Sequence, residues 1–480
     1  MRFRGGWNLG LGALLALGLL GGCSDSTSAS DDGGQDGVDG ADDGGQDGGE
    51  GDLPDAADGA DTTPGCGNGV AEENESCDGE DLRGQTCAGL GYTGGELACS
   101  ECKLDRTGCA SACDNDLCET GETATSCSAD CGARDVACGT FHTCAVRNDG
   151  TLWCWGGEAG LQAGGMGRTS VPRPVPGITG ASQVCAGEGH TCVLIGSGVR
   201  CFGRNGFGEA GQHPGQAFVF PPAVVPGLEQ GVTGISCGRF HTCAKGDGKV
   251  TCWGRNDSGQ AGAPRTVRLH TPVETAMPEV VGVATGGRHT CASSGVSAVY
   301  CWGYGAEGAL GSGVGEWTTA PGASLLPDTN GQVGAGDRHA CANRFSLGGE
   351  DPALYCWGAN EYGQVGQPAG APVLSPQLVQ MPSASMVAGG AAHTCALRFH
   401  GVYCWGRNDA GQLGDGTTTS THVPREIALD ARSLSVGESH TCVVLRDDLT
   451  VRCWGSNLQH QLGIGSADRQ SLIPVEPVGL

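Results

Sequence analysis

Seven copies of a His-(Thr/Ala)-Cys motif contain the residues of this sequence that are best suited to chemistry. Imidazole nitrogen and cysteine sulfur are common zinc ligands, and a cysteine beside a histidine can be an activated nucleophile. A second cysteine follows each motif, six times within Cys-Trp-Gly and once, at Cys201, within Cys-Phe-Gly. The motif histidines are His142, His190, His241, His289, His339, His393 and His440. The tryptophans after the second cysteine are Trp155, Trp253, Trp302, Trp357, Trp405 and Trp454.

The regular recurrence of the motif argues against a metal or catalytic site. The copies return about every 50 residues, which is typical of a repeat architecture. A catalytic site is usually unique in a chain, whereas these residues occur in every copy. We therefore predict that the histidines and tryptophans are structural parts of a repeated unit, and that the chain holds no cofactor and no metal.

Each motif and the Cys-Trp-Gly that follows it have the pattern of a β-hairpin. Short β-like runs flank turn residues such as Asn148-Asp149-Gly150 and Gly246-Asp247-Gly248. Cysteines that face each other on antiparallel strands are within the reach of a disulfide. The predicted bridges are Cys144–Cys154, Cys192–Cys201, Cys243–Cys252, Cys291–Cys301, Cys341–Cys356, Cys395–Cys404 and Cys442–Cys453.

Three further cysteines precede the histidines of the first three copies. Cys138, Cys185 and Cys237 share what looks like one repeat position, and equivalent positions of adjacent copies are expected to lie too far apart for a bridge. Without Cys23, 27 of the 28 cysteines remain, so at least one thiol is unpaired or bonds externally. We expect these three to be buried free thiols.

The N-terminus is predicted to be an export signal. Arg2 and Arg4 precede an apolar run that ends in Leu20-Gly21-Gly22-Cys23, and the run is too short for a membrane span with these flanks. This ending resembles the lipobox of bacterial lipoproteins, which implies a signal peptide over residues 1–22 and a lipid anchor on Cys23. The alternative is an ordinary signal peptide with an incidental cysteine. Ser24 favours an outer-membrane or cell-surface location.

Two segments separate the signal from the repeats. Residues 23–65 form an acidic, Gly/Asp-rich linker, with 13 Asp or Glu and no Lys or Arg after Cys23, and are predicted to be a disordered tether. Residues 66–132 contain ten cysteines and no apolar run that could form a core, which predicts a disulfide module. Cys66-Gly67-Asn68-Gly69 with Cys77-Asp78-Gly79 resembles cysteine-rich repeats of secreted myxobacterial-type proteins. Cys99 and Cys102 alone would suit zinc, but disulfides are favoured in an exported chain.

The repeats in residues 133–480 predict an all-β fold. Each contains three or four short strand-like runs, one of them with proline, as in Val423-Pro424-Arg425. Such units match the blades of a propeller, and seven copies predict a seven-bladed ring. The last residues, 472–480, look like the proline-containing run that is missing before Asp135. We therefore expect them to complete the blade of residues 135–156 and to close the ring. We expect the protein to be a monomer.

The repeats resemble a known family. The run HTCALRFHGVYCWGRNDAGQLGDGTTTSTHVP, from His393 to Pro424, is similar to repeats of the regulator of chromosome condensation family, over residues 134–480. The resemblance implies a seven-bladed β-propeller. It also implies guanine-nucleotide exchange on a nuclear GTPase, which does not suit an exported chain. Light-sensing members carry tryptophan directly before the repeat histidine, where this chain has Phe141, Gly189, Phe240, Arg288, Arg338, Ala392 and Ser439.

These patterns favour a binding protein over an enzyme. We predict a membrane-anchored, cell-surface module that recognises an extracellular protein or glycan with one propeller face; the alternative is an extracellular hydrolase or lyase that uses the channel. The net charge of −26 argues against nucleic acid as a partner. Variable loops on a rigid ring usually carry binding, so residues 307–331 and 343–354, which break the repeat, are candidate loops.

Overall fold

The computed structural model describes residues 71, 76–87, 94–95, 97–100, 103–105, 109–110 and 127–480, the last with gaps at 158–164, 166, 278, 296–297, 328–331, 345–352 and 383. All of them belong to the second of two compact units, Asp61–Leu480; the first is Met1–Ala60. Within these described ranges no helix is long and apolar enough to cross a membrane. The predicted signal peptide 1–22, the predicted lipid attachment at Cys23 and the predicted linker 23–65 lie outside them.

Short paired strands and disulfides form the described part of the cysteine-rich segment. β1 (Gly94–Gly95) pairs with β4 (Cys109–Ala110), and β2 (Ala98–Ser100) pairs with β3 (Lys103–Asp105). Cys99 is bonded to Cys77, so its sulfur is not a zinc ligand. The one helix of the described residues, α1 (Ser128–Cys131), leads into the first strand of the repeats.

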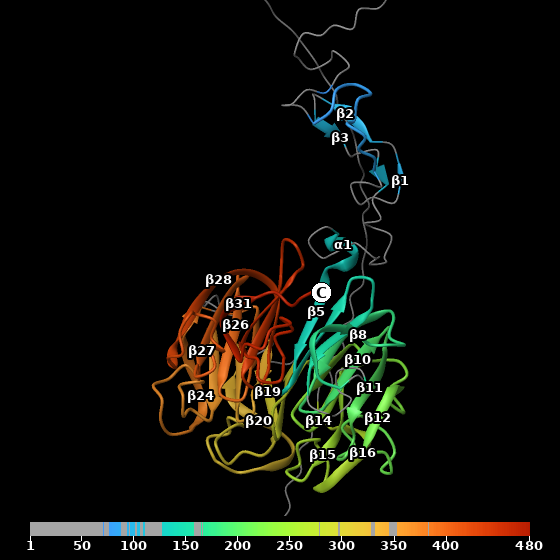
Figure 1. Ribbon diagram of the computed structural model, residues 1–480. Helices are drawn as coiled ribbons and strands as arrows, with labels where there is room; N and C mark the ends of the chain where they lie inside the picture. The colour runs from blue at the N-terminus through green and yellow to red at the C-terminus, as the bar shows by residue number, and fades with distance from the viewer. Residues whose placement is uncertain are drawn as a thin grey trace, which may run out of the picture. The chain divides into compact units, whose positions relative to one another are not determined.

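The repeats fold into four-stranded antiparallel units (Figure 1). The first strands are β5 (Ala133–Cys138), β9 (Ala181–Ala186), β13 (Gly234–Cys237), β17 (Val280–Thr285), β21 (Val333–Ala335), β25 (Met386–Gly389) and the end of β28 (Thr421–Val436). The second strands are β6 (His142–Arg147), β10 (His190–Ile195), β14 (His241–Gly246), β18 (His289–Ser294), β22 (His339–Arg344), β26 (His393–Arg398) and β29 (His440–Leu445). The third strands are β7 (Leu152–Gly156), β11 (Gly198–Arg204), β15 (Lys249–Asn256), β19 (Ala298–Gly303), β23 (Ala353–Gly358), β27 (Gly401–Gly406) and β30 (Val451–Ser456). The fourth strands are β8 (Thr169–Pro174), β12 (Phe218–Val224), β16 (Thr266–Thr275), β20 (Thr318–Pro327), β24 (Val373–Pro382), the start of β28, and β31 (Gln470–Val475).

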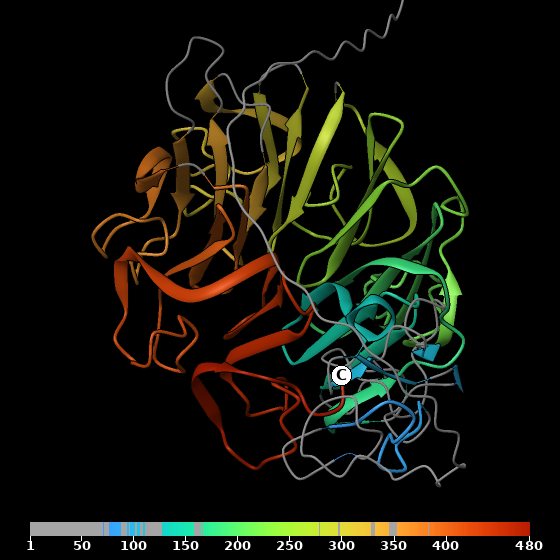
Figure 2. The same ribbon diagram turned by 90° about the horizontal axis from the view of Figure 1, so that it is seen from above.

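The long strand β28 is the fourth strand of one unit and the first strand of the next. It joins β25 to β31 into a seven-stranded sheet, while five other sheets of the repeats have four strands each. Counted with β28 in both, the repeats comprise seven units, called units 1–7 below in chain order. They are arranged around a central axis with their first strands innermost (Figure 2). The fold is therefore an all-β propeller.

The predicted closure of the ring by the last strand is wrong. β31 pairs with β30 of its own unit, through Gly455 opposite Ser471, and β8 completes unit 1 by pairing with β7, through Gly156 opposite Thr169. The proline-containing run thus always follows its own Cys-Trp-Gly strand. The physical reason is local: the loop after each third strand returns the chain along that strand's free edge.

A belt of backbone hydrogen bonds closes the ring instead. One amide of each unit donates to a carbonyl of the next, and the last bond joins Glu438 N–H of unit 7 to the Gly139 carbonyl of unit 1, at 3.4 Å. The other six bonds run from Thr140 to Gly187, Glu188 to Arg239, Arg239 to Gly286, Gly287 to Asp337, Asp337 to Gly390 and Ala391 to Glu438. The belt surrounds one end of the channel.

Glycine is required at the belt. A Cβ on Gly139 would lie 2.5 Å from the Gly187 carbonyl oxygen and 2.7 Å from Cε1 of His142. Glycine stands three residues before the motif histidine in all seven units, at Gly139, Gly187, Gly238, Gly286, Gly336, Gly390 and Gly437. The sequence signal is therefore Gly-x-x-His-x-Cys, which is longer than the motif used to find the repeats.

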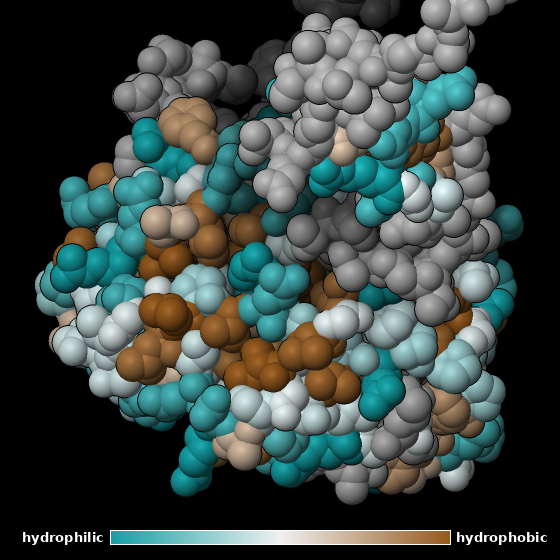
Figure 3. Space-filling view, turned by 45° about the horizontal axis from the view of Figure 1, so that its top comes forward, coloured by the Kyte–Doolittle hydropathy of each residue, from teal (hydrophilic) through white to brown (hydrophobic). Residues whose placement is uncertain are grey.

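The core lies between neighbouring units. The six motif tryptophans and Phe202, which replaces the seventh, are fully buried between sheets. By contrast, the outermost strands expose apolar side chains such as Phe218, Leu325 and Ile473. Figure 3 shows brown, apolar residues gathered between teal, polar ones on the surface that faces the viewer.

Candidate functional site

The motif histidines join adjacent units. His440 Nε2 and Thr143 Oγ1 of the neighbouring unit are 2.9 Å apart, and the same pair forms at five other interfaces over 2.7–3.1 Å. The hydroxyl of Thr143 donates to the carbonyl of Gln461 at 2.7 Å. Since that hydroxyl hydrogen is committed, the threonine oxygen must accept from an Nε2–H of the histidine.

Burial keeps these histidines neutral. It lowers the pKa of His142, His190, His241, His339, His393 and His440 to about 3, and that of His289 to about 4. A fully buried imidazole that donates to threonine is not available for proton transfer at neutral pH. The geometry therefore assigns these residues to the scaffold.

One interface lacks the histidine–threonine pair. The fifth motif reads His-Ala-Cys, so Ala340 stands where His289 would find a threonine. Both residues are buried, and among the side chains that the structure describes none bonds to His289 Nε2. Unlike the other motif histidines, His289 bonds to the backbone of His339, and it is the one motif histidine whose Nε2 has no partner among the described residues.

The tryptophans act beside the threonines. Trp155 Nε1 donates to the same Gln461 carbonyl as Thr143, at 2.9 Å, and this bond also spans the interface of units 7 and 1. Four other tryptophans make the equivalent bond, at Trp253, Trp357, Trp405 and Trp454. None is available for stacking on a ligand, because all are fully buried.

Each hairpin of the seven units carries one disulfide. The cysteines are directly opposite in the strand register, with Cα atoms 4.0–4.1 Å apart. The pairs are those named from the sequence. These sulfurs are therefore neither thiolate ligands nor nucleophiles.

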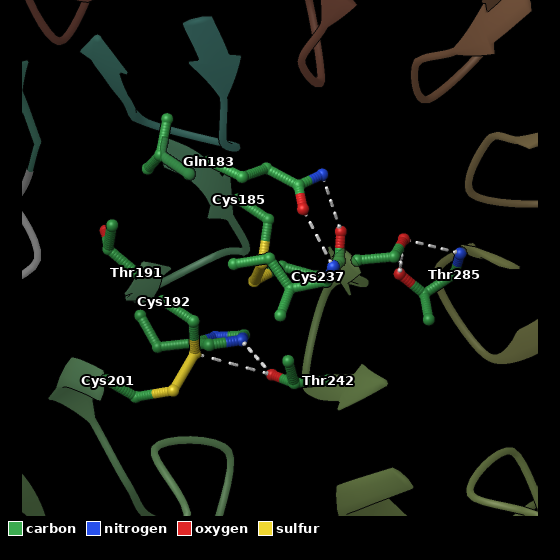
Figure 4. Close-up of a disulfide and its surroundings, with 12 residues drawn as sticks. Gln183, Cys185, Thr191, Cys192, Cys201, Cys237, Thr242 and Thr285 are labelled. Atoms are coloured by element: carbon green, nitrogen blue, oxygen red, sulfur yellow. Dashed lines mark hydrogen bonds between the residues drawn. A yellow bond between two sulfur atoms is a disulfide. The ribbon is translucent and has the colours of Figure 1, made fainter. Parts of the chain in front are cut away.

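The expectation of three free thiols is wrong for two of them. Cys185 and Cys237 form a disulfide between units 2 and 3, with Cα atoms 5.3 Å apart (Figure 4). The three cysteines do not share one repeat position: Cys185 is five residues before its histidine, whereas Cys138 and Cys237 are four before theirs. On a strand this offset turns the two side chains in opposite directions, so that Cys185 and Cys237 face each other across the interface.

Cys138 has no cysteine opposite it. The residue that corresponds to Cys185 in the preceding unit is Ser435, and Cys138 N–H donates to Ser435 Oγ at 2.9 Å. The same pair of positions at the interface of units 3 and 4 holds Ser236 and Thr285, whose hydroxyls are 2.8 Å apart. Cys138 is the free cysteine of the described residues, and burial raises its pKa to about 12.

A cluster of arginines and aromatic rings covers the belt end of units 2–6, and we call it the arginine–aromatic face. Its members either precede the motif histidine or follow the Cys-Trp-Gly run. Because His241 pairs with Gly254 across the hairpin, these two positions lie at the same end of the sheet. The face comprises Arg204, Phe207, Arg239, Phe240, Arg255, Arg288, Tyr304, Arg338, Tyr362 and Arg407.

Contacts run continuously across this face. Phe207 and Phe240 pack edge to face at 5.5 Å between ring centroids, and Arg255 lies over both rings at 5.1 and 5.3 Å. Arg288 lies 4.8 Å from the centroid of Tyr304. Arg407 lies 5.3 Å from the ring of Tyr362. The face therefore presents arginines held in place by aromatic rings.

Carboxylates between the arginines complete the network. Arg239 bridges Glu188 at 2.6 Å and Asp337 at 3.3 Å, and Arg338 binds Glu307 at 2.8 Å. Burial raises the pKa of Asp337, although Arg239 and Arg338 counteract this. A cavity of about 460 Å³ opens among Arg239, Phe240, Arg288, Tyr304 and Arg338.

The candidate loops are only partly described. Glu307, the first residue of the loop 307–331, contributes to this cavity, whereas residues 328–331 and 345–352 lie outside the described residues. The arginines were missed because they do not break the repeat; they occupy variable positions within it. The signal would have been the enrichment of arginine and aromatic residues beside the motif histidine and after Cys-Trp-Gly.

Comparison with known proteins identifies the family to which the repeats belong. Residues 157–478 match the RCC1-like domain, and residues 133–159 match the regulator of chromosome condensation (RCC1) repeat. The chain belongs to the RCC1-like domain family. The RCC1-like domain thus covers the propeller described above.

Individual relatives agree with this assignment. The ultraviolet-B receptor UVR8 of Arabidopsis thaliana is 34% identical over 187 residues, which are 37% of this chain and 42% of the receptor. An X-linked retinitis pigmentosa GTPase regulator homolog of Caenorhabditis elegans is 27% identical over 48% of this chain and 20% of its own length. The chain therefore spans less than half the length of these relatives.

Solved structures agree on the fold. The crystal structure of Prp20p from Saccharomyces cerevisiae superposes with a TM-score of 0.59 at 20% identity, over 68% of this chain and 85% of that one. Human WBSCR16 gives a TM-score of 0.58 at 21% identity, over 66% and 87%. At these identities the likeness concerns the propeller fold alone.

Proposed function

We propose that this RCC1-like protein is a cell-surface binding protein and not an enzyme, and that it recognises a protein partner through the arginine–aromatic face. In this proposal residues 1–22 are a lipoprotein signal, Cys23 carries the lipid, residues 23–65 tether a disulfide module of residues 66–132, and a monomeric seven-bladed propeller of residues 133–480 faces the exterior. The partner is an extracellular protein; nucleic acid is excluded by the acidic balance of the chain.

The composition of the face supports the proposal. Arginine and large aromatic residues provide most of the binding energy in protein interfaces, and they cluster near the centre of such interfaces. Here six arginines and four aromatic rings (Phe207 and Phe240 among them) are packed against one another at one end of the ring. Being held by cation–π contacts and ion pairs, their side chains lose little freedom on binding. Prp20p, a relative in fold, binds Gsp1p and histones; the identity of those partners does not transfer.

Site-specific photo-crosslinking tests the face. A photoreactive phenylalanine analogue at Tyr304, which is 36% exposed, should capture a defined envelope protein in living cells. The control is the same analogue at Phe399. This residue is 79% exposed and lies in the turn between β26 and β27, at the opposite end of unit 6 from the face. The captured band should disappear in Arg255→Ala and persist in Arg173→Ala, an exposed arginine on β8. Equal capture from both positions would refute the assignment of the face.

Lipid labelling tests the anchor separately. The full chain should incorporate labelled palmitate and fractionate with membranes, and Cys23→Ala should lose both properties. Labelling of the Cys23→Ala chain, or a soluble wild-type chain, would contradict the anchor without touching the proposed face.

A further inference from the structure

A second cavity lies at the other end of the channel. It has a volume of about 730 Å³ and is lined by residues near the start of the innermost strands, among them Gln183, Gly234, Ile235, Lys245, Gly282 and Val333. The innermost strands run from this cavity to the glycine belt, so the cavity and the arginine–aromatic face are at opposite ends. A volume of this size suits a small ligand or the end of a chain.

In units 1 and 2, a side chain from the first strand accepts a hydrogen bond from the main chain of the next unit's first strand, close to this cavity. Asp135 stands seven residues before His142, and its Oδ2 accepts the N–H of Val184 in unit 2 at 2.9 Å. Gln183 stands at the same position of unit 2. Its Oε1 accepts the N–H of Ile235 at 3.0 Å and its Nε2 donates to the Ile235 carbonyl at 3.3 Å (Figure 4).

In units 3 and 4 the corresponding side chain is missing. Gly234 and Gly282 occupy the position seven residues before His241 and His289. The backbone groups that they would serve belong to Val283 and Val333, six residues before the next histidines. Among the described residues, no side chain bonds to the main chain of Val283 or Val333. The cavity opens at these two glycines.

A cation and apolar side chains complete the cavity. The stem of Lys245 lies over Gly234, because a Cβ there would be 2.7 Å from Lys245 Cε, and Lys245 Nζ donates to the Val281 carbonyl at 2.6 Å. Ile235, Val281 and Met386 line the same space. The cavity thus combines the ammonium of Lys245, backbone N–H groups without a side-chain partner, and an apolar wall.

We propose that this cavity binds a carboxylate that carries an apolar substituent. One carboxylate oxygen accepts a backbone N–H of Val283 or Val333, as Asp135 does at Val184, and the other accepts from the Lys245 ammonium. The apolar substituent packs on Ile235, Val281 and Met386. At the equivalent positions of units 1 and 2, the protein itself places a carboxylate, Asp135, and a carboxamide, Gln183. A peptide carboxyl terminus and a fatty acid both have this chemistry.

Calorimetric titration of the full chain tests the site, with N-acetyl-leucine for a peptide end and octanoate for a fatty acid. Either acid should bind, the tighter one indicating the source, and the methyl ester of each should not. Lys245→Met should weaken binding about tenfold or more through loss of a charge-assisted hydrogen bond. Lys249→Met is the matched control, because Lys249 is an exposed lysine at the start of β15 in the same hairpin and forms an ion pair with Glu274.

A second variant fills the site from within. Gly282→Gln supplies at unit 4 the carboxamide that Gln183 supplies at unit 2, and it should abolish binding while the melting temperature shows that the chain folds. Its Cβ would lie 2.7 Å from Ser293 Oγ, a rotatable group, so the fold can adjust. Absence of binding by both acids, or equal binding by Lys245→Met and Lys249→Met, would overturn the proposal. Crosslinking at Tyr304 is independent of these variants, so the two proposals fail separately.

Discussion

His440 of the last unit donates a hydrogen bond to Thr143 of the first, 297 residues away along the chain, with 2.9 Å between Nε2 and Oγ1. The hydroxyl of Thr143 in turn donates a hydrogen bond to the Gln461 carbonyl of the last unit. The ring is thus held shut by side chains and backbone amides between complete units, and not by a shared strand. This relationship makes the closure measurable with single substitutions.

Thr143→Val should destabilise the propeller by about 1–3 kcal/mol, because it removes both bonds and leaves a buried imidazole N–H without an acceptor. Denaturant unfolding followed by tryptophan fluorescence measures the change. Thr242→Val makes the same change at an interface that is also joined by the peptide chain. Equal losses indicate a closed ring, whereas a much smaller loss for Thr143→Val would contradict closure. Thr266→Val, at an exposed position of β16, should leave the midpoint unchanged.

Ala340→Thr should stabilise the propeller by about 0.5–1.5 kcal/mol, since its hydroxyl supplies the missing partner for His289 Nε2. The Ala309 carbonyl, which accepts Trp357 Nε1 at 3.0 Å, is then shared by a threonine and a tryptophan, as at four other interfaces. Thermal melts check the sign. Ala342→Thr, at an equally buried position without an unpaired histidine nitrogen beside it, should destabilise the propeller. A lower melting temperature for both variants would show that a hydroxyl at position 340 does not bond to His289.

Ser435→Cys should form a disulfide with Cys138 that joins units 7 and 1. The two positions correspond to Cys185 and Cys237, which bridge with Cα atoms 5.3 Å apart. Thiol titration of the denatured, unreduced chain should find one thiol fewer than in the wild type, and peptide mapping should recover the linked peptides. Ser433→Cys, two residues earlier, should instead add one thiol. An added thiol in Ser435→Cys would refute the correspondence.

Acid should unfold the propeller well before its carboxylates are all protonated. The folded pKa values of about 3 to 4 for the motif histidines lie below the ordinary value of about 6.5 for the unfolded chain. Between these values the unfolded state binds more protons, so stability is full above pH 6.5 and falls as the pH drops toward 3. Unfolding free energies measured from pH 7 to pH 4 should show this decline. His190→Gln, which removes one such group, should make the slope shallower; an unchanged or steeper slope would contradict the assignment.

The sequence was sufficient for what is local or repeated. Residues 9 to 15 apart, such as Cys144 and Cys154, must face each other once the turn between them is recognised as a hairpin turn. The count of repeats predicted the propeller, and all-β sheets follow from it. These features depend on strand alternation and turn chemistry, which a single repeat already contains.

Contacts between units could not be predicted in the same way. A shift of one residue decides whether a side chain points to the left or the right neighbour, and overlooking that shift made Cys185 and Cys237 look unpairable. Likewise, Gln470–Val475 has the same composition whether it closes its own unit or the first. The arginine–aromatic face required the structure because Arg255 and Arg288 belong to different repeats and meet only around Asp257.

The glycine belt also limits what can move along the axis of the ring. The cavity at the belt is about 60 Å³, against about 730 Å³ for the cavity at the other end, and a side chain at any of the seven glycines would collide with the neighbouring carbonyl or histidine. The channel therefore narrows toward the belt, and its wide opening is the one beside Lys245. A small ligand at that opening and a protein on the arginine–aromatic face would therefore bind at opposite ends of the ring.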